Sequence, residues 1–194
     1  MPGTRAIRGP GTAERCLDIA ERLVQMRGFN NFSYADIARE LEITTASLHY
    51  HFPGKAELGH ALIARYTERF IAALGRIDRD QSDAQTKLEA YAGLYSDVLQ
   101  GQRMCLCGIL AAEYQTLPEA MRQAVTHFFD ENQKWLVAVL TKGHADRTLC
   151  ITDPVDELAH SIISTLEGAM LVARPYGDPA IFNSTARHLL ASLT

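Results

Sequence analysis

The chain has 194 residues, 47% of them hydrophobic, and a formal net charge of −4 at pH 7. This length and composition predict a folded protein, either one compact domain or a small domain joined to a medium one, rather than a disordered chain. No window approaches ~20 uninterrupted apolar residues, and no apolar stretch follows the first twelve residues, so neither a membrane span nor a secretory signal is expected.

The charge is unevenly placed along the chain. The N-terminal arm, Met1 to Thr12, holds Arg5 and Arg8 and no acidic residue. Residues 1–66 hold eight Lys or Arg against seven Asp or Glu, whereas residues 67–194 hold eleven against sixteen. A neutral-to-basic beginning on an acidic remainder is compatible with a protein that binds phosphates at one end only.

Three short helices are predicted next, over residues 13–27, 34–41 and 45–51. Gly28 ends the first helix, and Ser33 with Asp36 resembles the capping box of the second. Thr44 is the N-cap candidate of the third helix, which the sequence Phe-Pro-Gly over residues 52–54 ends. Their apolar side chains can close a miniature core, formed by Cys16, Ala20, Leu23, Phe29, Ile37, Leu41, Ile43, Leu48 and Phe52.

The stretch SYADIARELEITTASLHYHFPGK, residues 33–55, is typical of a helix-turn-helix over about residues 33–52. Its second helix would carry hydroxyls, imidazoles, a phenol and an alanine outward, groups that can bind phosphates and base edges. The alternative is a packed helical hairpin with no DNA to read. The candidate DNA-binding residues are Ser33, Thr44, Thr45, Ala46, Ser47, His49, Tyr50, His51 and Lys55.

Residues 13–65 resemble the DNA-binding domain of the TetR/AcrR family of bacterial transcriptional regulators. The matching segments are GFNNFSYADIARE, ITTASLHYHF and PGKAEL. The resemblance implies an all-helical homodimer, a pseudo-palindromic operator, and release of DNA when a small ligand binds the C-terminal part. It also implies that residues 44–51 read DNA and that Lys55 meets phosphate. One departure is His49, which stands where many members have a tyrosine that meets a phosphate, so the main phosphate contact stays open.

The rest of the chain is predicted to be helical over residues 56–77, 83–100, 105–114, 118–142, 154–173 and 179–192, with loops between. Proline in the first turn marks three of these starts, at Pro118, Pro154 and Pro179. No segment alternates with a period of two for long, so the fold class is all-α. We expect a DNA-binding domain over residues 1–55 with its three-helix helix-turn-helix, and a helical ligand-binding and dimerisation domain over residues 56–194.

The C-terminal part supplies candidates for an effector site. Bulky and polar side chains midway along the helices can line a mostly apolar pocket, although each of them can equally be core. Cys105 and Cys107, beside Arg103 at a helix start, can have reactive thiols or can be small buried hydrophobes. The candidate ligand-binding residues are Tyr91, Tyr95, Cys105, Cys107, Tyr114, His127, Phe128 and Trp135.

The four cysteines, which include Cys16 and Cys150, are too sparse for a disulfide framework and favour reduced thiols in the cytoplasm. A metal site formed by Cys105 and Cys107 with His127 or His144 has no support from their spacing, and no metal or cofactor is expected.

The last two helices are predicted to form the dimer interface, because a two-fold operator needs a dimer. The alternative is that their apolar faces are buried within one chain. The candidate dimer residues are Leu158, Ile162, Leu166, Gly168, Met170 and Leu189.

The function predicted from the sequence is a cytoplasmic, sequence-specific transcriptional regulator, a repressor that a small ligand releases from its operator. Two alternatives are a regulator that senses oxidants or electrophiles through Cys105 and Cys107, and a helical ligand-binding protein that does not bind DNA. No catalytic constellation is present in the sequence, so an enzyme is not expected. The long helix over residues 56–77 would link the two domains and change the separation of the DNA-reading helices.

Overall fold

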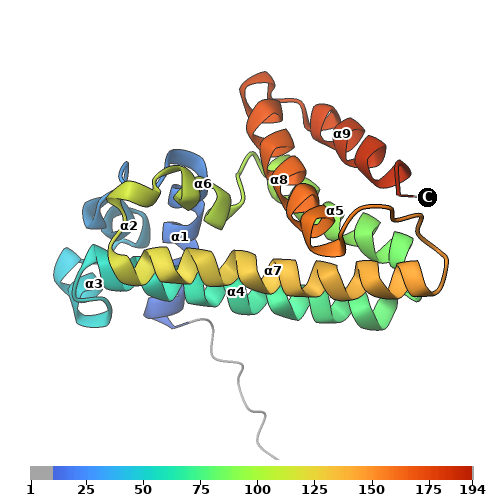
Figure 1. Cartoon of the computed structure of the whole chain (residues 1–194). Helices are drawn as coiled ribbons and strands as arrows, with labels where there is room; N and C mark the ends of the chain where they lie inside the picture. The colour runs from blue at the N-terminus through green and yellow to red at the C-terminus, as the bar shows by residue number, and fades with distance from the viewer. Residues whose placement is uncertain (1–10, 194) are drawn as a thin grey trace, which may run out of the picture.

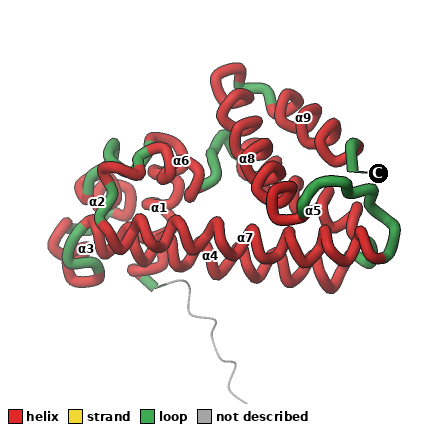
Figure 2. Tube along the Cα trace, viewed as in Figure 1, coloured by secondary structure: helices red, strands yellow, loops and turns green. Residues whose placement is uncertain are grey.

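The structure is a computed structural model that describes residues 11–193. These residues form α-helices and two short 3₁₀ turns, with no strand among them (Figures 1 and 2). The basic arm with Arg5 and Arg8 falls outside the described residues, apart from its last two. The helices are α1 (Thr12–Arg27), α2 (Tyr34–Leu41), α3 (Thr45–His51), α4 (Lys55–Asp80), α5 (Ala84–Gln100), α6 (Leu106–Ala112), α7 (Glu119–Ala145), α8 (Val155–Ala173) and α9 (Pro179–Ala191).

The helices α1 to α3 form a small N-terminal head, and α4 to α9 form a larger body (Figure 1). The long helices α4 and α7 lie side by side along the length of the molecule, and α5, α8 and α9 pack together at the end away from the head. The short helix α6 lies against α1, so it joins the two parts. Within the described residues, no helix is long and apolar enough to cross a membrane.

Local sequence signals explain the head. Ser33 and Asp36 form the predicted capping box of α2, and the Thr44 side chain accepts a hydrogen bond from the Ser47 N–H at the start of α3. Gly28 ends α1 with φ of +84°, a conformation that only glycine adopts without strain. The predicted miniature core is confirmed, because its members are buried except Ile43, which is half-buried and packs against it.

Two helices are longer than predicted. The helix α4 continues to Asp80, through residues expected in a loop, and α7 continues to Ala145. In α4, the Asp78 carboxylate accepts hydrogen bonds from Lys87 Nζ at 2.8 Å and from Trp135 Nε1 at 2.9 Å. These contacts from α5 and α7 hold the polar last turn of α4 in place, and nothing in its own sequence indicates them.

The α6 region is shorter than predicted. The helix runs only from Leu106 to Ala112, and Tyr114–Thr116 forms a 3₁₀ turn. Cys105 is the N-cap, because its sulfur accepts a hydrogen bond from the Gly108 N–H at 3.4 Å. Cys105 is therefore fixed at the start of α6 rather than within it.

Candidate DNA-binding surface and effector-binding core

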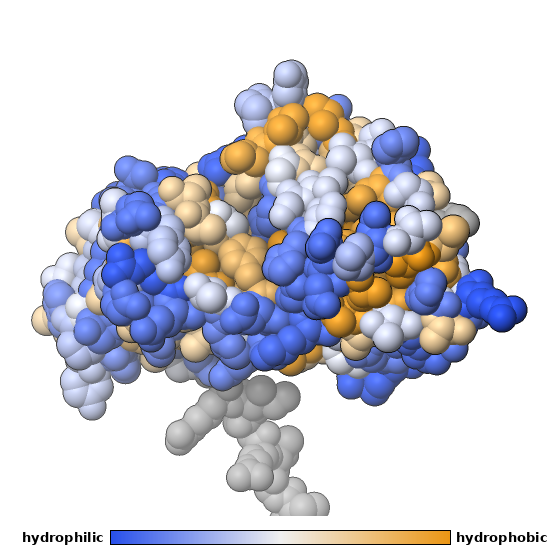
Figure 3. Space-filling view, viewed as in Figure 1, coloured by the Kyte–Doolittle hydropathy of each residue, from blue (hydrophilic) through white to orange (hydrophobic). Residues whose placement is uncertain are grey.

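The helix α3 presents a polar surface at the far end of the head. Leu48 is fully buried and anchors the helix, while its neighbours turn outward. Tyr50 is the most prominent of them, with 85% of its surface exposed. The surface over α2 and α3 is mainly hydrophilic (Figure 3). The outward-facing or half-buried candidates on and beside α3 are Thr44, Thr45, Ala46, Ser47, His49, Tyr50 and His51.

A tyrosine of α2 fixes the end of α3. The Tyr34 hydroxyl lies 2.9 Å from the Phe52 carbonyl oxygen and 2.6 Å from that of Gly54, and donates to them. Burial is the main reason that the pKa of Tyr34 is raised to about 12, so the hydroxyl stays a donor. The Tyr34 ring also packs on His49, with centroids 4.7 Å apart. The turn between the helices has Glu42 in the left-handed conformation, with φ of +56°.

One ring nitrogen of His49 already has a hydrogen-bond partner within the head. His49 Nδ1 lies 3.0 Å from the Pro53 carbonyl oxygen. Because that oxygen can only accept, Nδ1 carries the proton, and Nε2 is the nitrogen that remains for an external partner. In neutral imidazole Nε2 is an acceptor, so His49 can donate to a phosphate through Nε2 only when the ring is protonated.

The Lys55 side chain points into the head in this conformation, whereas a phosphate contact is expected from the sequence. Its ammonium donates to the Phe32 carbonyl oxygen at 2.5 Å and lies 4.8 Å and 4.3 Å from the ring centroids of Phe29 and Phe32. Burial lowers the pKa of Lys55. The ammonium is thus directed into the head, and a phosphate contact would require it to turn outward. Ser33 is exposed, but its hydroxyl donates to Asp36 Oδ2 at 2.7 Å as part of the cap.

The structure gathers most of the predicted effector residues in the centre of the body. Tyr91, Tyr95, Phe128, Cys105 and Cys107 are all buried there. The Tyr91 hydroxyl donates to Asn132 Oδ1 at 2.9 Å and lies 3.0 Å from the Tyr95 hydroxyl. Trp135 is half-buried and stacks on Tyr91, with ring centroids 5.4 Å apart.

Two predicted effector residues lie elsewhere. Tyr114 is 38% exposed near the head, where the Arg122 guanidinium lies 5.9 Å from its ring centroid. His127 is exposed on the outer side of α7, in a surface groove between α4 and α7. Neither belongs to the buried cluster: Tyr114 lies in the 3₁₀ turn before α7, and α7 turns His127 to the surface while it turns Phe128 inward.

Three members of the buried cluster are not among the predicted residues. Tyr66 of α4 donates from its hydroxyl to Cys105 Sγ at 3.8 Å, and Phe70 packs at 5.1 Å, centroid to centroid, from Phe128. The third is Glu167 of α8, whose Oε1 is buried with no hydrogen-bond partner among the described residues. In the sequence, nothing distinguishes these three residues from ordinary core or surface residues of a helix. Glu167 meets the others only because α8 packs against the rest of the body.

Arg103, which stands beside the two cysteines in the sequence, does not lower the pKa of either thiol. The Arg103 guanidinium donates to Gln25 Oε1 of α1 at 3.4 Å instead. Burial, and after it the charge of Glu167, raises the pKa of Cys105 and Cys107 well above the ordinary value for a thiol. Both side chains are therefore neutral thiols in this conformation. Among the described residues no group of three His, Cys, Asp or Glu side chains could hold a metal ion.

The carboxylate of Glu113 ties the body to the head. Glu113 follows the last residue of α6, and its Oε2 accepts hydrogen bonds from the Phe29 N–H at 2.7 Å and the Asn30 N–H at 3.3 Å. A Cβ placed on Gly28 would overlap this carboxylate, so the close approach requires glycine. Arg174, just after α8, donates to the Met26 carbonyl oxygen at the end of α1. The end of α1 is thus held from two sides of the body.

We predict that Glu113→Ala loosens the head. The Phe29 N–H loses its partner in a part-buried place, which costs about 1–3 kcal/mol. Hydrogen exchange should then be faster at Phe29 and Asn30, and chemical denaturation should show lower stability. Glu119→Ala is the control, because that carboxylate is exposed and pairs only with Arg122 and Gln123 of its own helix. Equal effects of the two substitutions would contradict the prediction.

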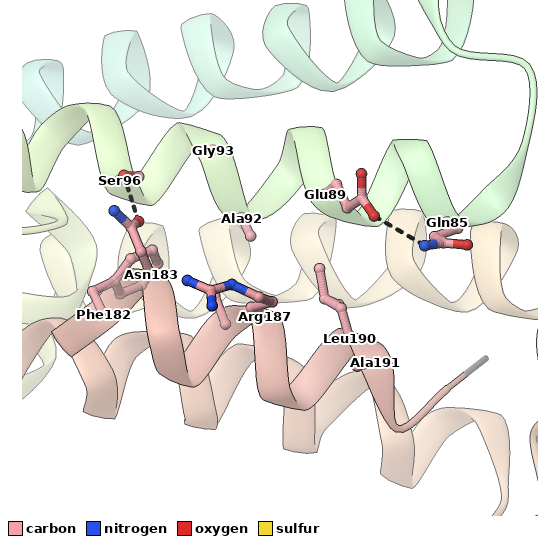
Figure 4. Close-up of a pocket in the computed structure, with 11 residues that line it drawn as sticks. Gln85, Glu89, Ala92, Gly93, Ser96, Phe182, Asn183, Arg187, Leu190 and Ala191 are labelled. Atoms are coloured by element: carbon pink, nitrogen blue, oxygen red, sulfur yellow. Dashed lines mark hydrogen bonds between the residues drawn. The ribbon is translucent and has the colours of Figure 1, made fainter. Parts of the chain in front are cut away.

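A separate groove of about 380 Å³ lies between α5 and α9 (Figure 4). Ser96 and Asn183 face each other across it, with Ser96 Oγ donating to Asn183 Oδ1 at 2.9 Å, and Arg187 projects along it. None of the predicted effector residues lines this groove.

The outward face of α8 differs from the predicted dimer face. Ile162, Leu166 and Met170 are fully buried within one chain, so the expectation that they contact a partner is wrong. They lie four residues apart on the stripe that packs into the body. Gly168 is exposed, and Leu158 and Leu189 are half-buried. The exposed apolar residues near the end of α8 are instead Leu171, Val172 and Tyr176, and hydrophobic surface covers that end of α8 in Figure 3.

An all-helical chain with a helix-turn-helix head and a separate helical body defines a DNA-binding regulator. Comparison with known proteins agrees. Residues 17–62 match the family model for bacterial regulatory proteins of the tetR family, and residues 84–189 match the model for a tetracyclin repressor-like C-terminal domain. The second match alone covers more than half of the chain. The chain belongs to the TetR family of bacterial transcriptional regulators.

Solved structures and a curated relative support this membership. A TetR-family transcriptional regulator from Agrobacterium tumefaciens is 35% identical with a TM-score of 0.91, covering 94% of this chain and 97% of that one. A TetR regulator from Legionella pneumophila is 32% identical with a TM-score of 0.86, covering 97% and 100%. The transcriptional regulator AcuR from Cereibacter sphaeroides is 25% identical over 76% of this chain and 69% of its own length.

Proposed function

We propose that this protein is a cytoplasmic repressor that binds a pseudo-palindromic operator as a homodimer and leaves it when a small effector binds the body. The observation that carries the proposal is the polar, outward-facing α3, anchored by one buried leucine and fixed at its end by Tyr34. Hydroxyl, imidazole and phenol groups on such a helix suit the major groove. Repression rather than activation follows the family's usual mode. The division near residue 55 into a DNA-binding and a regulatory domain belongs to this proposal.

The dimer is proposed to form through the outer faces of α8 and α9. Leu171 and Val172 are 64% and 57% exposed, which is unusual for aliphatic side chains on a soluble helix. Ser161, Ser164 and Gly168 lie exposed on the same face and would allow another helix to approach closely. In a two-fold dimer the two α3 helices would need to lie about 34–36 Å apart to enter successive major grooves.

The effector is proposed to act by changing that separation. The buried cluster in the body contacts α4 through Tyr66 and the start of α6 through Cys105. Both helices lead to the head, α4 by continuity of the chain and α6 through Glu113. A ligand that pushes these helices apart from α8 would rotate each head and spoil the fit to the operator. Equal head separations with and without effector would contradict this mechanism.

The test is a gel-shift titration on DNA that flanks the protein's own gene, at two salt concentrations and with random DNA as competitor. Tight, salt-sensitive binding that survives the competitor is expected. Ser47→Ala and Tyr50→Ala should each weaken specific binding by about 1–3 kcal/mol, the value of one base contact. Thr126→Ala is the control, because Thr126 is exposed on α7 and only donates to the Arg122 carbonyl oxygen. The same titration can use an operator selected from genomic DNA. If both α3 variants bind that operator with unchanged affinity, the proposal is refuted.

A second candidate function is electrophile sensing at Cys105. The observation in its favour is that the sulfur accepts hydrogen bonds from the Gly108 N–H and the Tyr66 hydroxyl at the N-terminus of α6. Donors there would stabilise a thiolate that adds to the β-carbon of an α,β-unsaturated carbonyl compound. The thiol proton would pass to Glu167 and then to the α-carbon of the adduct, so no oxidant is needed. Against this candidate, burial raises the pKa of Cys105.

N-ethylmaleimide tests the second candidate, in a Cys150→Ser background because Cys150 is the exposed cysteine. Sensing predicts an adduct at Cys105 by mass spectrometry and a loss of DNA affinity that Cys105→Ser prevents and Cys107→Ser does not. Release of DNA in the Cys105→Ser protein would exclude the candidate.

A further inference from the structure

The carboxyl group of Glu167 is an unusual feature of the body. One of its oxygens, Oε1, is buried and has no hydrogen-bond partner among the described residues. The other, Oε2, lies so close to Gly108 of α6 that a Cβ at that position would overlap it. The Cys105 thiol hydrogen-bonds the carboxyl group and lowers the pKa of Glu167, against the larger effect of burial. Buried polar atoms in native proteins almost always have partners, so the unpaired Oε1 is unfavourable. An effector that supplies the partner would remove this penalty.

The groups around Glu167 supply no positive charge. Those whose pKa responds to its charge are the phenol of Tyr66 on α4, the phenols of Tyr91 and Tyr95 on α5, and the thiols of Cys105 and Cys107 at the start of α6. No lysine, arginine or histidine is among these groups. The hydroxyls are also engaged elsewhere, Tyr66 with Cys105 and Tyr91 with Asn132.

Aromatic rings make up much of the same region. Phe70 is at their centre, with ring centroids 6.4 Å from Tyr66, 6.2 Å from Tyr91 and 6.1 Å from Tyr95. The faces of such rings carry negative electrostatic potential and attract cations. A carboxylate whose charge acts on the phenols of Tyr66, Tyr91 and Tyr95 therefore favours a positively charged guest over a neutral one, and it repels an anion.

We propose that Glu167 recognises a small organic cation, an effector with an ammonium group that pairs with the carboxylate and an apolar part that packs among the rings. This inference rests on the proposed function, in which the body binds an effector. The ammonium would give Oε1 the donor that it lacks. To make room, Glu167 would move away from Gly108, and α6 would be freed to shift with Glu113 and the head.

Benzylammonium is the probe, with benzyl alcohol as the neutral analogue of similar size and benzoate as the anion. Differential scanning fluorimetry and calorimetric titration of the full-length protein without DNA measure binding. Saturable binding and thermal stabilisation are expected for benzylammonium, and at least about tenfold weaker binding for the two analogues, which lack the charge pair. Glu167→Gln should weaken the binding of benzylammonium by a similar factor. Glu157→Gln should not, because Glu157 is exposed in the first turn of α8.

The calorimetry gives a second readout. Burial raises the pKa of Glu167 to about 7, and pairing with a cation would lower it, so binding near pH 6.5 should release a proton. The heat of binding should then depend on the buffer's ionisation enthalpy in the wild type and not in Glu167→Gln. The proposal is overturned if benzylammonium shows no saturable binding, if an analogue binds as well, or if Glu167→Gln binds it unchanged. A gel shift without effector tests the DNA-binding function separately, so either can fail alone.

Discussion

Replacing Leu48 with alanine is expected to abolish DNA binding while the body stays folded. Leu48 is fully buried and is the residue by which α3 packs into the head. Loss of a buried leucine in this way costs about 2–5 kcal/mol, from lost apolar burial and from the cavity left behind. The head has only a small core, so this amount is a large part of what holds α3 in position.

Circular dichroism and hydrogen exchange can separate loss of the head from loss of the whole protein. Amides of α2 and α3 should lose protection, while those of α7 and α8 keep it. Tyr50→Ala is the comparison, since its side chain is 85% exposed: it should weaken DNA binding without lowering the melting temperature. Undiminished operator affinity in Leu48→Ala would show that α3 does not depend on this core.

Glu167→Gln is expected to stabilise the protein at pH 8 and to change it little at pH 5. The pKa of Glu167 is raised by burial to about 7 in the folded state, above its ordinary value of 4.5. The folded state therefore holds this proton more tightly than the unfolded state, and stability falls as pH rises from about 4.5 to about 7. At pH 8 the wild type carries a buried charge that glutamine lacks, and a shift of this size corresponds to about 3 kcal/mol.

Urea denaturation of both proteins at pH 5 and pH 8 measures this difference directly. The groups facing Glu167 are neutral phenols and thiols with raised pKa values, so they do not titrate in this interval. Glu157→Gln again serves as the control. A stabilisation at pH 8 together with lost cation binding would mean that the carboxylate is kept at the expense of stability, as binding groups often are. If the difference in unfolding free energy between the two proteins is the same at pH 5 and pH 8, burial does not raise the pKa of Glu167.

The head could be predicted from the sequence because its determinants are local. The caps at Ser33 and Thr44, the stop at Gly28 and the helical spacing of apolar residues all act within a few positions. Even the small core joins residues whose helices are joined by short turns. The orientation of Lys55 could not be predicted, because it depends on the rings of Phe29 and Phe32 across the head.

The body was harder to predict because its contacts join distant residues. Glu113 meets Phe29 across 84 positions of the chain, and Glu167 meets Gly108 across the interval from α8 to α6. For α8, apolar residues occur on more than one side, so the sequence could not distinguish the stripe inside the chain from the outward one. Ile162, Leu166 and Met170 therefore lie on the inward stripe, although the sequence predicts them at the dimer interface.

The unbroken course of α4 has a geometric consequence for operator recognition. Its 26 residues span about 39 Å, from beside α3 to the far end of the body. If one end is held while the helix tilts by about 5°, the other end moves by about 3.4 Å, which is the rise of one base pair. A tilt of a few degrees around a bound molecule would then move the head by a distance equal to the spacing of one base pair.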